Sequence, residues 1–221
     1  MQEVQFYFLI ILGAVAFITA QLLWQSGFHG GLGQFEQTLR AAAFQVGSII
    51  TTTGFSTVDF NVWPSASKWV LVLLMFIGAC AGSTGGGIKV SRIVILAKSI
   101  KKELIVLAHP RTVRKVMLDG QVVPHDVLRA INVFMASYLI FFGASVFLIS
   151  LDGFSLETNF TAVAATLNNI GPGLDAVGPT ANFSAYSPMS KIILIFDMLA
   201  GRLEIFPMLM LFMPATWRRN G

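Results

Sequence analysis

Long apolar segments alternate with shorter and more polar ones along this chain. Residues 4–24 carry no charge, and a helix of that length crosses a hydrocarbon core of about 30 Å at about 1.5 Å per residue. The segment is too long for the apolar part of a signal peptide. Further apolar segments at 67–81, 127–151 and 191–213 bring the expected number of membrane crossings to four.

Two short amphiphilic segments, 35–50 and 155–167, lie between these crossings and are bounded by turn residues. The chain therefore runs span, short segment, span, basic stretch, span, short segment, span, which is one unit repeated. This order predicts residues 1–108 as the first unit, 109–126 as a cytoplasmic linker and 127–221 as the second unit.

A matching residue pattern supports the duplication. The pattern S-K-x-x-L-x-x-x-M-x-x-G begins at Ser67 and again at Ser190. Leucine and methionine are common in membrane helices, so the glycine ten residues after each lysine, Gly78 and Gly201, is the more specific part of the match. Both units should have the same orientation. The predicted fold class is all-α integral membrane, with two tandem helix–pore-loop–helix repeats and a glycine-rich loop that breaks the second span of the first repeat.

Composition agrees with a lipid environment. Apolar residues make up 55% and charged residues 12% of the 221, whereas soluble domains carry about 25% charged residues. The single cysteine, Cys80, excludes a disulfide within the chain and is given no function.

Basic residues gather in two places. Basic side chains next to short loops mark the cytoplasmic side, so both places are predicted to be cytoplasmic, and nucleic-acid binding is not needed to explain them. Eleven of the fifteen belong here: Lys89, Arg92, Lys98, Lys101, Lys102, Arg111, Arg114, Lys115 and Arg129 in the centre, and Arg218 and Arg219 at the end.

Each short segment leads into a glycine-bearing loop, TTTGF at 51–55 and NNIGPG at 168–173. Backbone at membrane depth is tolerated where it is buried in protein or lines water. Successive carbonyls can replace the hydration shell of a cation if one residue adopts a conformation that glycine permits, a role that fits Gly54 and Gly171. The alternative is that both are ordinary extracellular loops. Five acidic residues are expected on the same side, where they either concentrate cations or form a solvated face: Glu36, Asp59, Asp152, Glu157 and Asp175.

The run at 82–87 holds four glycines and cannot form a stable helix, since each glycine costs about 1 kcal/mol relative to alanine. It is expected to be a hinge or a loop. A phosphate-binding loop is ruled out because Ile88, not lysine, follows Gly87. Close packing of helices through small residues is a further alternative.

Arg202 is a charge in an apolar span, which costs about 2.5 to 3.5 kcal/mol on insertion scales unless a partner compensates it. Asp197 and Glu204 are near in sequence, but neither spacing suits a salt bridge on one helix. The alternative is a snorkelling or purely structural arginine.

These motifs together resemble the Trk/Ktr/HKT family of potassium transporters. They are TTTGF at 51–55, GACAGSTGGGIK at 78–89, NNIGPG at 168–173 and GRLEIFP at 201–207, and the resemblance covers nearly the whole chain. The family carries four helix–pore-loop–helix repeats in one subunit, and this chain resembles the third and fourth. The resemblance implies channel-like potassium conduction, with K⁺ as the transported ion and no cofactor.

The resemblance also implies specific residues and partners. It assigns ion-facing carbonyls to Thr52, Thr53, Gly54, Asn169, Ile170 and Gly171, and a gate to Gly82, Ser83, Thr84, Gly85, Gly86, Gly87, Lys89 and Arg202. It further implies a bacterial inner-membrane location, missing N-terminal repeats, a homodimer of the complete subunit, and a cytosolic regulatory subunit that binds nucleotides and docks on the stretch 98–115.

Three other functions are open to the sequence. An intramembrane hydrolase built on Ser83 lacks a base, because His29, His109 and His125 fall in loops or cytoplasmic segments; the chain is therefore not expected to be an enzyme. An alternating-access cation symporter is more credible, since broken helices also mark transporter sites. A non-conducting structural fragment is the third.

Overall fold

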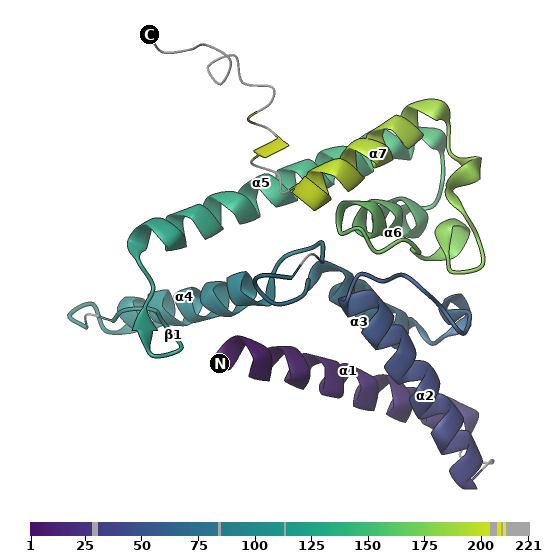
Figure 1. The fold of residues 1–221 in the computed structure, drawn as a ribbon, viewed down its shortest axis with the longest axis horizontal. Coiled ribbons are helices and arrows are strands. Elements are labelled where there is room, and N and C mark those ends of the chain that lie inside the picture. Colours follow the sequence, from purple (N-terminus) through teal and green to yellow (C-terminus); the bar gives the residue numbers. More distant parts are fainter. Residues whose placement is uncertain (28–30, 84, 113, 204–206, 209, 211–221) are drawn as a thin grey trace.

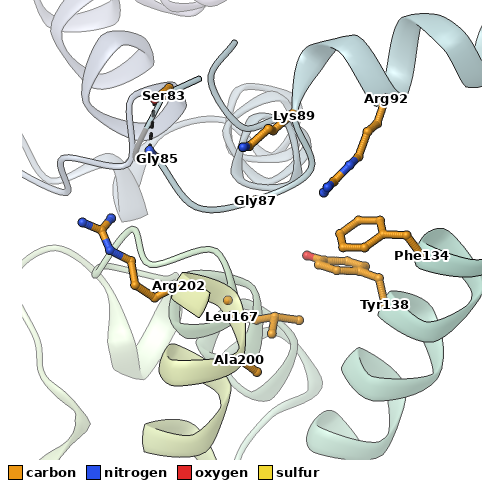
Figure 2. Close-up of a pocket in the computed structure, with 11 residues that line it drawn as sticks. Ser83, Gly85, Gly87, Lys89, Arg92, Phe134, Tyr138, Leu167, Ala200 and Arg202 are labelled. Atoms are coloured by element: carbon orange, nitrogen blue, oxygen red, sulfur yellow. Dashed lines mark hydrogen bonds between the residues drawn. The ribbon is translucent and has the colours of Figure 1, made fainter. Parts of the chain in front are cut away.

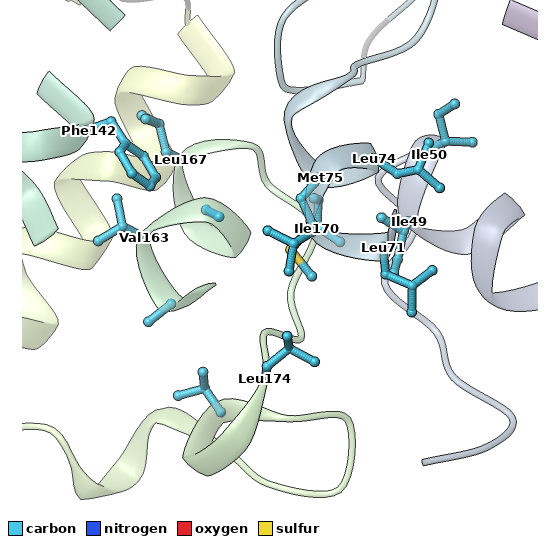
Figure 3. Close-up of a cluster of buried hydrophobic side chains, with 14 of the residues drawn as sticks. Ile49, Ile50, Leu71, Leu74, Met75, Phe142, Val163, Leu167, Ile170 and Leu174 are labelled. Carbon is cyan, nitrogen blue, oxygen red and sulfur yellow. The ribbon is translucent and has the colours of Figure 1, made fainter. Parts of the chain in front are cut away.

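The computed structural model describes residues 1–27, 31–83, 85–112, 114–203, 207–208 and 210. Two groups of helices lie side by side, with α1 to α4 in one group and α5 to α7 in the other (Figure 1). A core of apolar side chains joins the groups, with Leu71 and Met75 from the first and Val163 and Ile170 from the second (Figure 3).

Two helices among the described residues are long and apolar enough to cross a membrane. They are α1 (Gln2–Ser26) and α5 (His125–Ile149), the latter extended by a 3₁₀ turn, η2 (Ser150–Asp152). Many of their large apolar side chains are exposed, as expected of helices whose outer faces meet lipid. They contain the predicted spans 4–24 and 127–151 and extend past them by one or two residues at each end.

Two further helices end at the glycine-bearing loops. The first, α2 (Gly31–Ile50), has 20 residues and begins four residues before the predicted start at 35. The second, α6 (Leu156–Leu167), has 12 residues and begins at a Ser155 side chain that accepts the Thr158 N–H, a normal N-cap. From Thr158 onward every residue of α6 except Phe160 is buried, so this part of the helix is enclosed by protein.

The second span of the first unit is shorter than predicted. Its first part, α3 (Ser65–Phe76), ends at Phe76 rather than near residue 81, and α4 (Val90–Ala108) follows it. The interval 77–89 is called the break below. Its two ends pair with each other, because Ile77 and Ile88 form a parallel β-bridge and the Gly78 N–H donates to the Ile88 carbonyl at 2.8 Å. The pairing satisfies backbone groups that would otherwise be exposed in lipid.

The connection between α4 and α5 contains a feature that the all-α prediction missed. Two short strands, β1 (Met117–Leu118) and β2 (Gln121–Val122), form an antiparallel hairpin whose turn includes Asp119 and Gly120, both at positive φ. Asp-Gly is a favoured pair for a two-residue hairpin turn.

The last described helix is α7 (Pro188–Leu203), preceded by three single 3₁₀ turns in the outer loops: η1 (Phe60–Val62), η3 (Asp175–Val177) and η4 (Phe183–Ala185). The predicted end of the fourth span near residue 213 lies outside the described residues. So do Thr84, Glu204, Arg218 and Arg219.

Candidate functional site

The two glycine-bearing loops leave their helices through the same backbone geometry. At the end of α2, the Thr53 N–H donates to the Ser48 carbonyl at 2.9 Å and the Thr52 N–H donates to the Ile49 carbonyl at 3.0 Å. At the end of α6, Ile170 donates to Ala165 at 2.8 Å and Asn169 donates to Thr166 at 3.0 Å. This pair of bonds is the Schellman motif.

The conformations of the loop residues also correspond. Thr52 and Asn169 are left-handed, with φ of 56° and 55°, and Gly54 and Gly171 have φ of 78° and 116°. A threonine with positive φ is uncommon and carries strain. Within the described part of the chain, no hydrogen bond reaches the carbonyl oxygens of 52–54 or 169–171.

The two loops lie against each other. A β-carbon added at Gly54 would overlap the Ile170 carbonyl oxygen, and it would lie 3.3 Å from the Pro172 ring. Only glycine permits that approach. The loops are 117 positions apart in the chain and adjacent in space, so their carbonyls are brought to one region.

The break packs beneath the second loop. A β-carbon added at Gly86 would overlap the Asn168 carbonyl oxygen, and one added at Gly78 would overlap the Gly86 carbonyl oxygen. The second unit has the same crowding, because a β-carbon at Gly201 would overlap the Leu167 carbonyl oxygen. The two glycines that end the repeated pattern are therefore both close-approach positions.

A cavity of about 190 Å³ lies between the break and α5, α6 and α7 (Figure 2). Three basic residues that line it are Lys89, Arg92 and Arg202. Arg202 is on the same side of the cavity as Ser83 and Gly85, whereas Arg92 stacks on the Phe134 ring at 4.1 Å. Of the residues assigned to a gate, Ser83, Gly85, Gly87, Lys89 and Arg202 share this cavity. Gly82 is exposed and does not line it.

A buried hydrogen bond next to this cavity was not anticipated from the sequence. The Tyr138 hydroxyl of α5 donates to the Asn168 side-chain oxygen at 2.8 Å, and Asn168 is fully buried. The Asn168 amide donates to the Ala164 carbonyl at 2.8 Å. Asn168 therefore joins α5 to the end of α6 at the point where Gly86 packs. The sequence feature that could have indicated this bond is the Tyr138 hydroxyl within an apolar span.

A second buried polar pair, also missed, links α5 to α7. The Ser145 hydroxyl donates to the Asp197 carboxyl at 2.7 Å, and Asp197 is 0% exposed. Asp197 lies on the packed face of its helix and does not line the cavity that contains Arg202. The sequence feature that could have indicated this pair is the acidic Asp197 within an apolar span.

The acidic residues that were predicted to lie on the outer side make structural contacts. Glu157 pairs with Lys68 at 3.1 Å, Glu36 pairs with Arg40, and the Asp152 carboxylate accepts the Ser187 N–H at 2.8 Å. The Asp59 carboxylate accepts the Asn61 N–H at 2.9 Å.

Asp175 has the densest set of these contacts. The Ser155 and Thr158 hydroxyls each donate to its carboxylate at 2.6 Å. These two hydrogen bonds, Ser155 first, lower the pKa of Asp175 from its ordinary value. Asn61 of the first unit bonds the Asp175 backbone through both its amide and its carbonyl, at 3.1 and 2.9 Å.

Long apolar helices, two matched loops and a broken helix define a helical membrane transport protein. A family model described as "Cation transport protein", TrkH, matches residues 3–219. The chain belongs to this family, and it is accordingly a membrane protein.

Named relatives agree with the family. The chain is 42% identical over 201 residues to the Trk system potassium uptake protein TrkH of Escherichia coli K12, covering 91% of this chain and 41% of that protein. It is 38% identical to the Halomonas elongata protein of the same name, covering 98% and 44%. The crystal structure of the potassium transporter TrkH from Vibrio parahaemolyticus matches with a TM-score of 0.87 and 36% identity, over 98% of this chain and 45% of that one.

The chain thus spans less than half the length of these relatives. Their names describe transport, a non-enzymatic function, as the sequence predicted.

Proposed function

We propose that this chain forms half of a potassium-conducting pathway. Backbone carbonyls of Thr52, Thr53 and Gly54, together with those of Asn169, Ile170 and Gly171, would replace water around K⁺. The supporting observation is that both sets follow a helix C-terminus through the same left-handed turn and carry no internal hydrogen bond. A helix C-terminus carries an effective charge of about −0.5, which favours a cation.

The two equivalent methionines support the claim of half a pathway. Met75 of α3 is 1% exposed and packs in the core with Ile170 of the second loop (Figure 3). Met198, its counterpart on α7, is 46% exposed and lines a groove of about 530 Å³ beside the same loop. We infer that the loop of a preceding repeat fills this groove, so that four units close a ring.

The break is proposed as the gate. Gly86 packs under the second loop at the Asn168 carbonyl, and the cavity below is lined by Lys89 and Arg202. Positive charge at this place would resist cation passage. Moving the break would open the route, and the glycines permit that motion because they restrict φ least.

An alternating-access carrier is the second candidate. The observation in its favour is the discontinuous helix pair α3 and α4, since broken helices also mark carrier sites. Single-channel recording separates the two, because stepwise currents far above carrier turnover would exclude alternating access.

Two partners are proposed, of which the regulatory subunit lies on the cytoplasmic side. We infer that a nucleotide-binding regulatory subunit docks on the basic stretch 98–115, and that the complete subunit forms a homodimer. Binding of such a subunit should weaken with rising salt, because the stretch carries Lys101, Lys102 and Arg111 on exposed or half-buried positions.

Complementation tests the proposed function. The chain is expressed in a bacterial host without its own potassium uptake, either alone or with the amino-terminal half of the Escherichia coli relative. Growth at low potassium and rubidium uptake are expected only for the pair. Rescue by the chain alone would contradict the half-pathway, and no rescue by a correctly inserted pair would contradict potassium conduction.

A further inference from the structure

Glu3, in the first turn of α1, binds the backbone on both sides of the glycine-rich run. Its carboxylate oxygen accepts the Ala81 N–H at 2.7 Å and the Ser91 N–H at 3.2 Å. Ala81 directly precedes Gly82, and Ser91 lies in the first turn of α4. One half-buried side chain therefore ties α1 to both flanks of the run.

The contact with Ser91 serves as a distant helix cap. The first four N–H groups of a helix have no partner within it, and Lys89 at the N-cap of α4 makes no side-chain capping bond. A carboxylate at this position accepts a charge-assisted hydrogen bond and also faces the positive end of the helix dipole. The start of α4 is thereby fixed by α1.

The two flanks of the run are held in different ways. On the side toward the pore loops, Gly86 is buried against the Asn168 carbonyl. On the other side, Gly82 is exposed, with φ of 88° and no heavy atom within 4 Å of an added β-carbon. Packing therefore holds the Gly86 side. On the Gly82 side, the Glu3 bond to Ala81 comes from outside the break, whereas the Ser83 N–H bond to the Cys80 carbonyl and the Gly85 N–H bond to the Ser83 hydroxyl, both at 3.0 Å, lie within it.

We propose that Glu3 is a positioning residue that restrains the break in its observed position. Movement of the break requires the Ala81 bond to open, while the Ser91 bond keeps α4 in place as the fixed side of a hinge. The restraint itself rests on the two Glu3 hydrogen bonds to Ala81 and Ser91. Its effect on ion flow rests on the proposed gating function.

A neighbouring contact supplies a matched control. Gln2, one residue before Glu3, accepts a hydrogen bond from Lys98 of α4 and does not touch the break. Gln2→Ala therefore weakens the attachment of α1 to α4 without freeing Ala81. Glu3→Gln keeps an acceptor oxygen and removes the charge.

Cys80 is the single cysteine of the chain and precedes Ala81, so it reports on the break directly. Inside-out membrane vesicles that contain the chain with the amino-terminal half are treated with a membrane-impermeant maleimide, and labelling of the 24.0 kDa chain is followed over time. Glu3→Ala should raise the labelling rate about tenfold, which corresponds to the loss of one charge-assisted hydrogen bond. Glu3→Gln removes the same charge near the Cys80 thiol but keeps an acceptor, so it should raise the rate less, and this difference from Glu3→Ala reports the lost hydrogen bond. Gln2→Ala should leave the rate near wild type.

Equal labelling of Glu3→Ala and wild type, at equal membrane levels, overturns the restraint. An equal rise in Gln2→Ala overturns it too, because loosening of α1 in general would then explain the rate. Rubidium uptake in the same vesicles separates the two claims: faster labelling with unchanged uptake supports the restraint and contradicts the gating function of the break.

Discussion

The second helices of the two units differ although they share one residue pattern. In the first unit, α3 stops at Phe76, two residues before Gly78, and the chain resumes as α4 at Val90. In the second unit, α7 runs without interruption through Gly201 to Leu203. A β-carbon added at either glycine would overlap a carbonyl oxygen, that of Gly86 in the first unit and that of Leu167 in the second.

The difference shows that the equivalent glycines of the two units, Gly78 and Gly201, pack against different neighbours. At Gly78 the neighbour is Gly86, at the other end of the break, whereas at Gly201 it is the end of α6. The break therefore occupies space beneath the loops, whereas α7 does not enter that space. The cavity that Arg202 lines lies between the break and α7. Changes on either side of this contact test the comparison.

The largest effect is expected at the shared glycines. Gly78→Ala and Gly201→Ala each force a β-carbon into a backbone carbonyl, which costs about 1 to 3 kcal/mol or more when neither backbone can move. The temperature at which the protein is inactivated in detergent should fall sharply for both variants. Gly143→Ala on α5 is the control, since an added β-carbon there meets nothing within 4 Å. Similar stability for all three variants would show that the packing is looser than described.

The next effect concerns the charge at the end of α7. Arg202→Ala should raise rubidium uptake of the assembled pair about threefold to tenfold, because one positive charge beside the cation route is removed. Arg202→Lys keeps the charge and should remain near wild type. Unchanged or lower uptake in Arg202→Ala, at equal membrane levels, would contradict a blocking role.

A smaller effect is expected where α5 meets the end of α6. Tyr138→Phe leaves the buried Asn168 oxygen without its donor and should cost about 1 to 2 kcal/mol. Tyr186→Phe is the matched control, because its hydroxyl donates to the buried Asn159 oxygen at 2.9 Å away from the break. Both should lose similar thermal stability, and only Tyr138→Phe should alter uptake. Equal uptake changes would show that the bond between Tyr138 and Asn168 affects uptake only through stability.

The smallest effect is the pH dependence of Asp175. Its native pKa is lowered, so its contribution to stability is complete above the unfolded pKa of about 4 and is lost as pH falls through the native value. Thermal stability of the wild type should therefore decline between about pH 5 and about pH 3. Asp175 has a φ of 55°, which asparagine also tolerates, so Asp175→Asn should keep the local backbone and show a shallower decline. Parallel curves would exclude this linkage.

Much of the fold could be predicted from apolar length and repetition. The spans of α1 and α5, the resumption of helix near Val90 and the break at the glycines all follow from residue type. The early end of α3 could not be predicted, because Ile77 is an ordinary apolar residue whose helix is ended by pairing with Ile88. Tertiary contact, not local preference, sets that boundary.

Some residues of the candidate site could likewise be identified from the sequence, whereas others could not. Gly54 and Gly171 were identifiable because glycine at a loop marks unusual backbone. Glu3, Tyr138 and Asn168 were not assigned roles, since each acts through a partner at least 30 positions away. Such contacts exist only after the chain has folded.

The central claim is that carbonyls of the two loops form an ion filter. The most direct test is to measure the ion preference of Gly171→Ala. An added β-carbon at Gly171 meets nothing within 4 Å, so the substitution disturbs the backbone at φ of 116° without a clash. Gly153→Ala also places a side chain at positive φ, 78°, outside the loops and without a clash. With the chain paired with the amino-terminal half, the ratio of rubidium to sodium uptake should collapse in Gly171→Ala and persist in Gly153→Ala. The same ratio in both variants would contradict a filter built from these carbonyls.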